Sequence, residues 1–229
     1  ETNWRLADNY KVPRMGFVNK MDRQGSDFLK VCNQIKTMLK SNAVPIVLPI
    51  GNEEDFKGII DLVKNRGIVW HEENKGSTFD VVDIPEDMKD EVEKYRANLI
   101  EAVAEYDDNL LEKFFEDPES ISEDEIHEAL RKAAQDMSII PMVCGSAFKN
   151  KGVQFLLDCV CRYLPSPIDK EAIVGTDPDN DSEILRKPSV SEPFSALAFK
   201  IATDPYVGRL AFFRVYSGRL DAGSYVFNN

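Results

Sequence analysis

Two short apolar segments that lie far apart in the chain constrain its fold more than any other feature. Residues 14–18 and residues 139–144 are mostly apolar, and each segment is followed by a polar loop and then by an amphipathic helix. The helices are expected over residues 28–39 and 153–160. Continuous apolar runs, as opposed to alternating ones, are typical of buried parallel strands. The sequence therefore predicts an α/β fold, in which ligands bind at the carboxyl ends of the strands.

The residues between these two segments follow a different pattern. Three short runs are strand-like, namely Ile46–Ile50, Phe56–Val63 and Gly67–Trp70. From Pro85 onward the apolar residues recur at helical spacing, and Ser122 and Glu125 are spaced as in a capping box. We therefore expect residues 41–137 to form an α+β subdomain that is inserted into the α/β domain and folds by itself.

The last third of the chain is predicted to begin a β-barrel. Residues 177–191 are rich in Asp, Ser and Pro, which favours a linker or an exposed loop. Strand-like runs follow at residues 194–203, 210–217 and 224–227, with glycines at the turns between them. The expected order is a split α/β domain (1–40 and 138–165) with its insert (41–137), a linker (166–192) and the start of a barrel domain (193–229).

The acidic charge of the chain is concentrated in the predicted insert. Between His71 and Asp136 there are 22 acidic and 7 basic side chains, whereas the remaining residues hold 18 acidic and 21 basic ones. A surface this acidic repels the phosphate backbone of nucleic acids. The segment is therefore either a solvated helical surface or a docking face for a basic protein partner.

Composition restricts the class of protein further. No apolar stretch approaches the roughly 18 residues that cross a membrane, and no signal peptide opens the chain. The four cysteines form no C-x-x-C pair, which favours buried, reduced thiols in a cytoplasmic protein. Because the two histidines lack a second histidine or cysteine at ligand spacing, no zinc site is expected.

The motif that is most informative about ligand binding is Asn19-Lys20-Met21-Asp22, directly after the first apolar segment. A carboxylate at Asp22 can accept hydrogen bonds from both the ring N–H and the exocyclic amine of guanine. Asn19 offers an amide to the base and to neighbouring loops, while the aliphatic stem of Lys20 can lie over the base plane. The competing interpretation is a polar loop whose Asn and Asp only cap the following helix.

A second short motif follows the other apolar segment. There, Gly145-Ser146-Ala147 occupies the position equivalent to that of the first loop. A backbone N–H near Ala147 could donate to guanine O6, and the Ser146 hydroxyl could brace Asp22. The two motifs in these matching contexts favour a guanine-specific site over a simple capping loop.

Together these segments resemble the elongation factor G family of translational GTPases. The resemblance rests on the N-K-M-D loop, on the insert of about 100 residues, on the run Gly145–Gly152 and on the stretch Phe194–Pro205, all in the family's order. It implies an incomplete P-loop-type GTPase domain that is interrupted by an α+β insert and followed by the first strands of a β-barrel. It further implies that Asn19, Lys20, Asp22, Ser146 and Ala147 bind the guanine of GTP or GDP.

The resemblance also implies partners and a role. The family promotes ribosomal translocation during protein synthesis, and its insert is associated with the ribosomal stalk protein, in keeping with the acidic surface predicted here. Two of the family's motifs are missing from these residues: G-x-x-x-x-G-K-[S/T], and a strand-ending D-x-x-G followed by histidine. No ligands for Mg²⁺ or the γ-phosphate are therefore expected here, so the parent protein should hydrolyse GTP whereas these residues alone should not.

Two alternatives remain open at this point. Another ribosome-acting GTPase, such as a relative of release factors or of tetracycline-protection proteins, would share the same base-reading motifs. A non-enzymatic acidic interaction module would carry the N-K-M-D match by accident. Only the GTPase interpretation predicts tight guanine-nucleotide binding by the parent protein.

Overall fold

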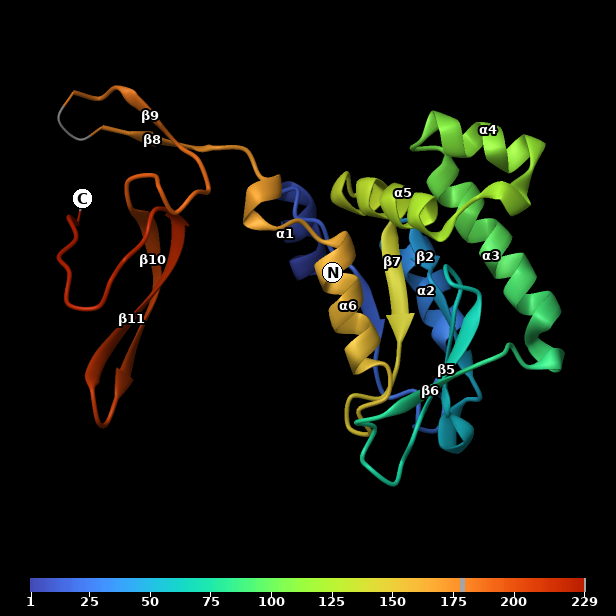
Figure 1. Cartoon of the computed structure of the whole chain (residues 1–229). Helices are drawn as coiled ribbons and strands as arrows, with labels where there is room; N and C mark the ends of the chain where they lie inside the picture. The colour runs from blue at the N-terminus through green and yellow to red at the C-terminus, as the bar shows by residue number, and fades with distance from the viewer. Residues whose placement is uncertain (178–179, 229) are drawn as a thin grey trace. The chain divides into compact units, whose positions relative to one another are not determined.

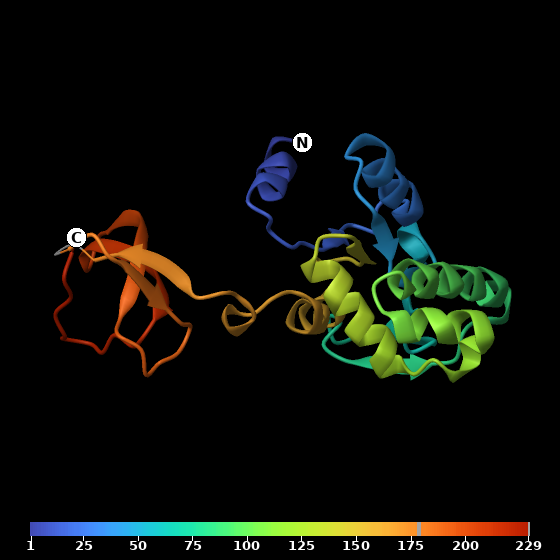
Figure 2. The same cartoon turned by 90° about the horizontal axis from the view of Figure 1, so that it is seen from above.

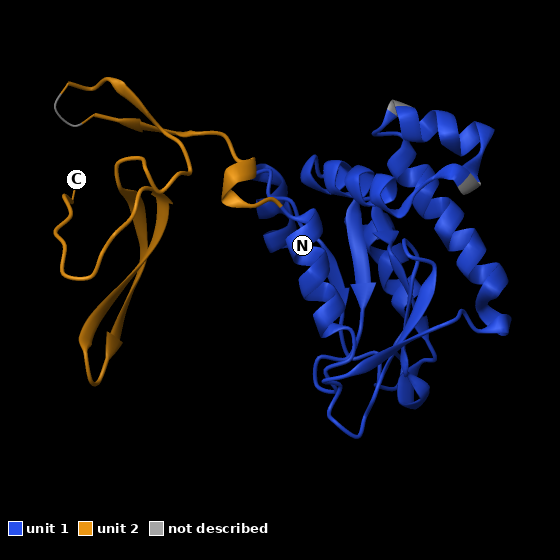
Figure 3. Cartoon of the chain, viewed as in Figure 1, with its two compact units in different colours: residues 1–164 blue, residues 165–229 orange. Residues whose placement is uncertain are grey.

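The protein forms two compact units, residues Glu1–Leu164 and Pro165–Asn229 (Figure 3). The computed structural model describes residues 1–177 and 180–228, without the side chains of residues 108 and 119. Residues 178–179, which belong to the expected linker, lie outside the described residues. None of the described helices is long and apolar enough to span a membrane.

The centre of the first unit is a three-stranded parallel sheet with the order β1-β7-β2. Strand β7 (Ile140–Cys144) lies between β1 (Gly16–Val18) and β2 (Ala43–Pro45), and it is parallel to both. All five residues of β7 are buried, as a continuous apolar run predicts. The expected α/β fold class is therefore confirmed.

The insert begins later in the chain than the sequence predicted, because of strand β2. This strand lies within residues 41–137, yet it pairs with β7, and the amide of Ile46 donates to the carbonyl of Met142 at 3.0 Å. The insert therefore leaves the parallel sheet after Pro45, not at residue 41. Three residues are too few to show strand periodicity, which is why the sequence did not reveal β2.

The insert begins with a four-stranded antiparallel sheet of order β3-β4-β5-β6. Its strands are β3 (Val47–Ile50), β4 (Gly58–Asp61), β5 (Arg66–Trp70) and β6 (Phe79–Val82). The first three match the predicted runs. Strand β6 was not predicted because it has only four residues, Phe79–Val82, and these are mostly exposed, so they form no buried apolar run.

Helices complete the first unit. The insert contributes α3 (Lys89–Ala104), α4 (Asp108–Glu116) and α5 (Glu123–Gln135), which gather on one side of the unit (Figures 1 and 2). The predicted capping box of Ser122 and Glu125 opens α5, which confirms it. The other helices are α1 (Thr2–Asn9), α2 (Phe28–Met38) and α6 (Val153–Tyr163), with short 3-10 turns at Glu53–Asp55, Glu86–Met88, Pro118–Ser120 and Pro167–Asp169.

The hydrophobic core does not stop at the edge of the insert. One cluster of buried side chains in the described chain includes Phe28 of α2 and Met142 of β7 together with Ile60, Leu99 and Leu130 of the insert. The expectation that the insert folds by itself is therefore not supported, because its sheet and helices share this core with the parallel sheet. The concentration of acidic charge in the insert suggested a separate folding unit, but the packing of buried side chains joins the insert to the parallel sheet.

The second unit consists of two antiparallel hairpins. Strands β8 (Ile173–Thr176) and β9 (Glu183–Arg186) pair within the stretch expected to be a linker, and β10 (Ser195–Asp204) pairs with β11 (Gly208–Ser217). The linker prediction missed the first hairpin because the polar residues between its strands dominate the composition. Residues 224–227, which were expected to be a strand, have no strand partner among the described residues and are irregular. Neither hairpin closes into a barrel.

Candidate functional site

The two predicted loops leave the same end of the parallel sheet. Strands β1 and β7 end in register, with Val18 opposite Cys144, so both loops begin side by side. The loops are then tied together, because the amide of Gly145 donates to the carbonyl of Val18 at 3.0 Å and the amide of Met21 donates to the carbonyl of Gly145 at 3.1 Å. The structure thus brings together two motifs that are more than 120 residues apart in sequence.

Asn19 links the two loops through its side chain. Its Oδ1 accepts hydrogen bonds from the amide of Lys20 at 2.8 Å and from the amide of Ala147 at 2.9 Å. Lys20 has a φ of +64°, in the left-handed region, and its side chain is exposed. The Ala147 amide that was expected to face guanine O6 therefore donates to Asn19 in this structure.

Asp22 is a shielded, ionised acceptor between the loops. Its side chain is only 7% exposed, and its nearest cation is the Nε of Arg23 at 4.0 Å. Burial by itself would raise the pKa of Asp22, but hydrogen bonds from Ser146 and from the Asp22 backbone N–H, with the charges of Lys149 and Arg23, hold the pKa below its ordinary value. The carboxylate is therefore an acceptor without a proton at neutral pH.

Ser146 is fixed from behind by a short backbone bridge. Its amide donates to the carbonyl of Lys151 and its carbonyl accepts from the amide of Lys151, both at 2.9 Å. Ser146 is 1% exposed, and its Oγ also accepts from the amide of Lys149 at 3.3 Å. Gly145 leaves no room for a side chain, since a Cβ there would lie 2.3 Å from the Lys151 carbonyl oxygen. Hydrogen bonds and a close backbone approach therefore hold this loop in place.

A hollow of about 400 Å³ lies beside the first loop. It is lined by Asn19 and Lys20 but not by Asp22, whose side chain is 7% exposed. Residues of the loop and of α2 complete the lining, including Arg23, Ser26, Asp27 and Lys30.

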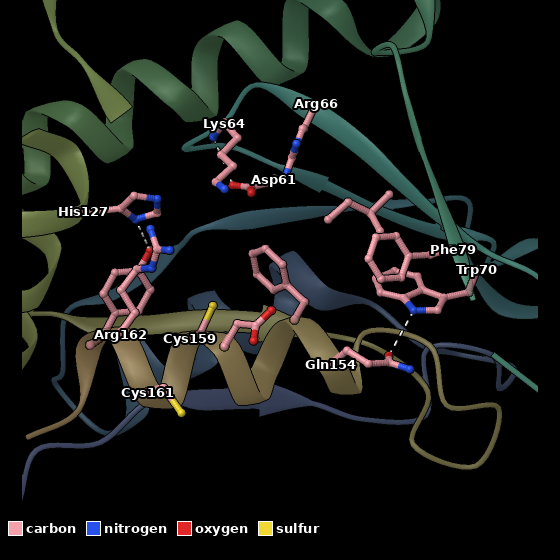
Figure 4. Close-up of a pocket in the computed structure, with 14 residues that line it drawn as sticks. Asp61, Lys64, Arg66, Trp70, Phe79, His127, Gln154, Cys159, Cys161 and Arg162 are labelled. Atoms are coloured by element: carbon pink, nitrogen blue, oxygen red, sulfur yellow. Dashed lines mark hydrogen bonds between the residues drawn. The ribbon is translucent and has the colours of Figure 1, made fainter. Parts of the chain in front are cut away.

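A second cavity, of about 530 Å³, lies between the antiparallel sheet and α6 (Figure 4). None of the predicted site residues lines it. In its walls His127 Nδ1 lies 2.7 Å from the Tyr163 hydroxyl, and the Trp70 indole N–H donates to Gln154 at 3.1 Å (Figure 4). No group of three or more potential metal-ligating side chains occurs anywhere in the described residues.

Sequence reasoning missed the residues that support the second loop. Lys151 is 2% exposed although it is a lysine, and it lies within the run Gly145–Gly152, where no role was assigned to it. Its partner Glu72 is 79 positions away in the insert. A motif within one loop can be found in a sequence, but a pair formed by two distant segments leaves no local signal.

Comparison with known families agrees with this architecture. The model of the elongation factor Tu GTP binding domain matches residues 1–166, and that of elongation factor G domain 2 matches residues 193–229. The chain therefore belongs to the family of proteins that carry the elongation factor Tu type of GTP-binding domain. The second match agrees with the hairpin β10–β11 as the opening of a following domain.

Within that family the chain is similar along its whole length to elongation factor G. It is 66% identical over 228 residues to elongation factor G of Cytophaga hutchinsonii and 59% identical over 229 residues to that of Amoebophilus asiaticus, with 100% of this chain covered in each case. The resemblance found in the sequence is thus confirmed. Each comparison covers 32% of the relative, so the chain spans about a third of the length of these curated relatives.

A solved structure shares the fold. The crystal structure of a protein from Thermus thermophilus superimposes with a TM-score of 0.74 at 25% sequence identity. The match covers 96% of this chain and 30% of the other.

Proposed function

We propose that these residues supply guanine recognition to a ribosome-dependent GTPase that promotes translocation during protein synthesis. The observation that carries the proposal is the shielded carboxylate of Asp22, which lies in the loop that the Asn19–Ala147 hydrogen bond ties to the second loop and whose pKa is lowered. The similarity to elongation factor G over the whole chain supports the same role.

The proposed selectivity follows from hydrogen-bond complementarity. Asp22 would accept from the ring N–H and the exocyclic amine of guanine, whereas adenine presents a lone pair at the matching ring nitrogen. Binding adenine would leave the buried carboxylate unpaired, and a site of that kind rejects the wrong ligand by about 10⁴-fold or more. Asn19 would contact the base and hold the loops together, Lys20 would lie over the base plane, and Ser146 and Ala147 would complete the pocket.

Phosphate chemistry is proposed to reside elsewhere in the parent protein. None of the site residues described above is a candidate ligand for Mg²⁺ or for the γ-phosphate, and we assign none of them a catalytic role. When bound, Mg²⁺ would neutralise charge on the phosphates of GTP. We accordingly expect the isolated 229-residue chain to release no phosphate from GTP in a colorimetric assay, while the full-length protein with ribosomes does so.

The partners of the parent protein are proposals of the same kind. The ribosome is the expected macromolecular partner in the cytoplasm, and the acidic face of the insert is the expected contact for the ribosomal stalk protein. The curated relatives favour elongation factor G over the release-factor and tetracycline-protection alternatives, since they carry that name at up to 66% identity.

The test of base recognition uses the full-length protein with Asp22→Asn. Asparagine replaces one acceptor oxygen of Asp22 by a donor NH2 group, which faces the exocyclic amine of guanine but can donate to the carbonyl that xanthine has at that position. We therefore expect GDP affinity to fall by about 100-fold or more and xanthosine diphosphate to become the preferred ligand. Titration with fluorescent analogues of both nucleotides measures the two affinities.

Asp204→Asn is the matched control for this substitution. Asp204 lies outside the hollow and accepts from the amides of Tyr206 at 2.8 Å and Val207 at 3.0 Å, which the side-chain oxygen of asparagine can also do. The control should therefore keep the preference for GDP. Unchanged GDP affinity in Asp22→Asn would overturn the proposal and favour the acidic interaction module instead.

A further inference from the structure

The second guanine loop is supported from behind by the turn that connects β5 and β6, residues 71–78, here called the β5–β6 connection. Lys151 reaches across to this connection from the loop. Its Nζ donates to Glu72 Oε1 at 2.7 Å and to the carbonyl oxygen of Phe56 at 2.9 Å. Lys151 is 2% exposed, whereas the Glu72 side chain is 62% exposed, so the buried ammonium depends on a carboxylate that comes from the surface.

Other polar contacts also join the second guanine loop to the β5–β6 connection. Lys149 Nζ lies 3.2 Å from the same Glu72 Oε1. The carbonyl oxygen of Gly76 accepts from Asn150 Nδ2 at 3.1 Å and from Gln154 Nε2 at 2.9 Å. These polar contacts all join residues of the insert to residues 149–154.

The backbones of the two segments also approach closely. A Cβ on Gly76 would lie 2.5 Å from the Lys149 carbonyl oxygen and 2.8 Å from that of Asn150, and Gly76 has a φ of +68°. Gln154 is in turn held by the indole of Trp70, which is 3% exposed (Figure 4). The loop therefore lies against a surface that belongs to the insert and that is itself anchored in the core.

This support is connected to the first loop, which carries the base-reading carboxylate, through two hydrogen-bonded steps. Lys151 pairs with the backbone of Ser146, and the residues on either side of Ser146 bond to the first loop, Gly145 by accepting from the amide of Met21 and Ala147 by donating to Asn19. The charge of Lys149, whose position Glu72 also fixes, acts directly on Asp22. A change at Glu72 thus reaches Asp22 without any contact between them.

We propose that Glu72 is a positioning residue for guanine recognition, which acts through Lys151 and Lys149 to set the place of Ser146 and hence of Asp22. The inference rests on the proposed function, because it assumes that Asp22 reads the base. It assigns to the insert a part in nucleotide specificity, since the residue that holds the loop comes from the insert. Removing the Glu72 charge leaves Lys151 with the Phe56 carbonyl and loosens the loop without creating a cavity.

The test compares guanosine and inosine diphosphates in the full-length protein with Glu72→Gln. Inosine lacks the exocyclic amine, so its affinity depends on fewer of the bonds that Asp22 makes. We expect the GDP dissociation constant to rise by about tenfold, which corresponds to the loss of one charge-assisted hydrogen bond. The dissociation constant of inosine diphosphate should rise by less than about threefold. The preference for GDP over inosine diphosphate should therefore fall.

Glu73→Gln is the matched control, because Glu73 is the neighbouring exposed carboxylate and makes no ion pair within the described part of the chain. It should keep the wild-type preference. Lys149→Met provides a second variant and should shift the preference in the same direction as Glu72→Gln. Far-UV circular dichroism checks that each variant is folded.

The outcomes separate this inference from the function on which it rests. Equal weakening of both nucleotides in Glu72→Gln, or no weakening of either, would overturn the positioning role while Asp22→Asn still switches the protein toward xanthosine diphosphate. If Asp22→Asn leaves nucleotide preference unchanged in the same assay, the proposed base recognition fails and the role of Glu72 fails with it.

Discussion

At the scale of the residue, His127 shows how the interior controls charge. Burial first, and then the positive charges of Arg162 and Lys64, lower the pKa of His127 to about 4, against a weaker opposing effect of Asp124. Its Nδ1 is engaged with Tyr163, and its Nε2 has no hydrogen-bond partner among the described residues. A proton on this ring would therefore be added next to two cations without a compensating acceptor.

This residue makes stability depend on pH. The ring takes up a proton near pH 6.5 when unfolded but only near pH 4 when folded, so between these values the unfolded state binds more protons. The contribution of the neutral His127 ring to the free energy of unfolding is complete above pH 6.5 and is lost as the pH falls toward 4. The loss is at most about 3 kcal/mol. We expect His127→Gln to lose less stability than the wild type between pH 7 and pH 4.5, as measured by urea unfolding. Parallel pH profiles for the two proteins would contradict this assignment.

The residues of the candidate site were predictable to the extent that their chemistry is local. Asn19, Lys20 and Asp22 occupy one short motif, and Ser146 and Ala147 occupy another in a matching context, so the sequence was enough to nominate all five. Glu72 could not be predicted as a site residue, because it is one of many carboxylates in an acidic segment. Its partner, the buried ammonium of Lys151, lies 79 positions away in the sequence.

At the scale of the element, α5 begins at a reciprocal cap. The Ser122 Oγ accepts from the amide of Glu125 at 3.3 Å, and Glu125 Oε2 accepts from the amide of Ser122 at 2.9 Å. Bonds from Lys113 first and then from Ser122 lower the pKa of Glu125 to about 2. The carboxylate therefore stays charged, and the cap stays formed, until the pH falls well below the ordinary range of a glutamate.

Removing this cap should weaken the helix by a measurable amount. Ser122→Ala leaves the amide of Glu125 without its acceptor, and we expect a loss of about 1 kcal/mol in the free energy of unfolding. Chemical denaturation of the 229-residue chain measures the loss. Ser77→Ala, at an exposed turn position, should change the free energy by less than about 0.5 kcal/mol. Equal effects of the two substitutions would show that the cap contributes nothing.

Elements were predicted well where they have a periodic apolar face and missed where they do not. Helices α2, α3, α5 and α6 follow their apolar spacing. Strand β2 is too short to show a period, β6 is mostly exposed, and β8 and β9 are separated by polar residues that resemble a linker. In each missed case the strand is defined by its hydrogen-bonded partner and not by its own composition.

At the scale of the whole molecule, the buried apolar core of the described chain lies within the first unit. In the second unit, long apolar side chains such as Phe199, Ile201 and Tyr206 are exposed, at 65%, 74% and 95%. Cooperative unfolding should therefore be a property of residues 1–164, since burial of apolar surface is the main source of stability.

Truncation tests this expectation directly. Residues 1–164 alone should unfold with a free energy within about 0.5 kcal/mol of that of the 229-residue chain. Both tryptophans, Trp4 and Trp70, belong to the first unit, so their fluorescence reports on the same transition in both proteins. A loss of more than about 1 kcal/mol would show that the second unit contributes to the stability of the first.

The position of β7 between β1 and β2 has a consequence for how the protein is made. Both flanking strands are synthesised first, but the central strand that pairs with each of them follows about 95 residues after β2. At roughly 5 to 20 residues per second, a nascent chain waits about 5 to 20 seconds before the sheet can close. During that interval β1 and β2 expose unpaired edges, and the whole insert must leave the exit tunnel before the loops that follow β1 and β7 can meet. Delayed protease resistance of the nascent chain, appearing only after Cys144 has emerged, is the kinetic signature of this topology.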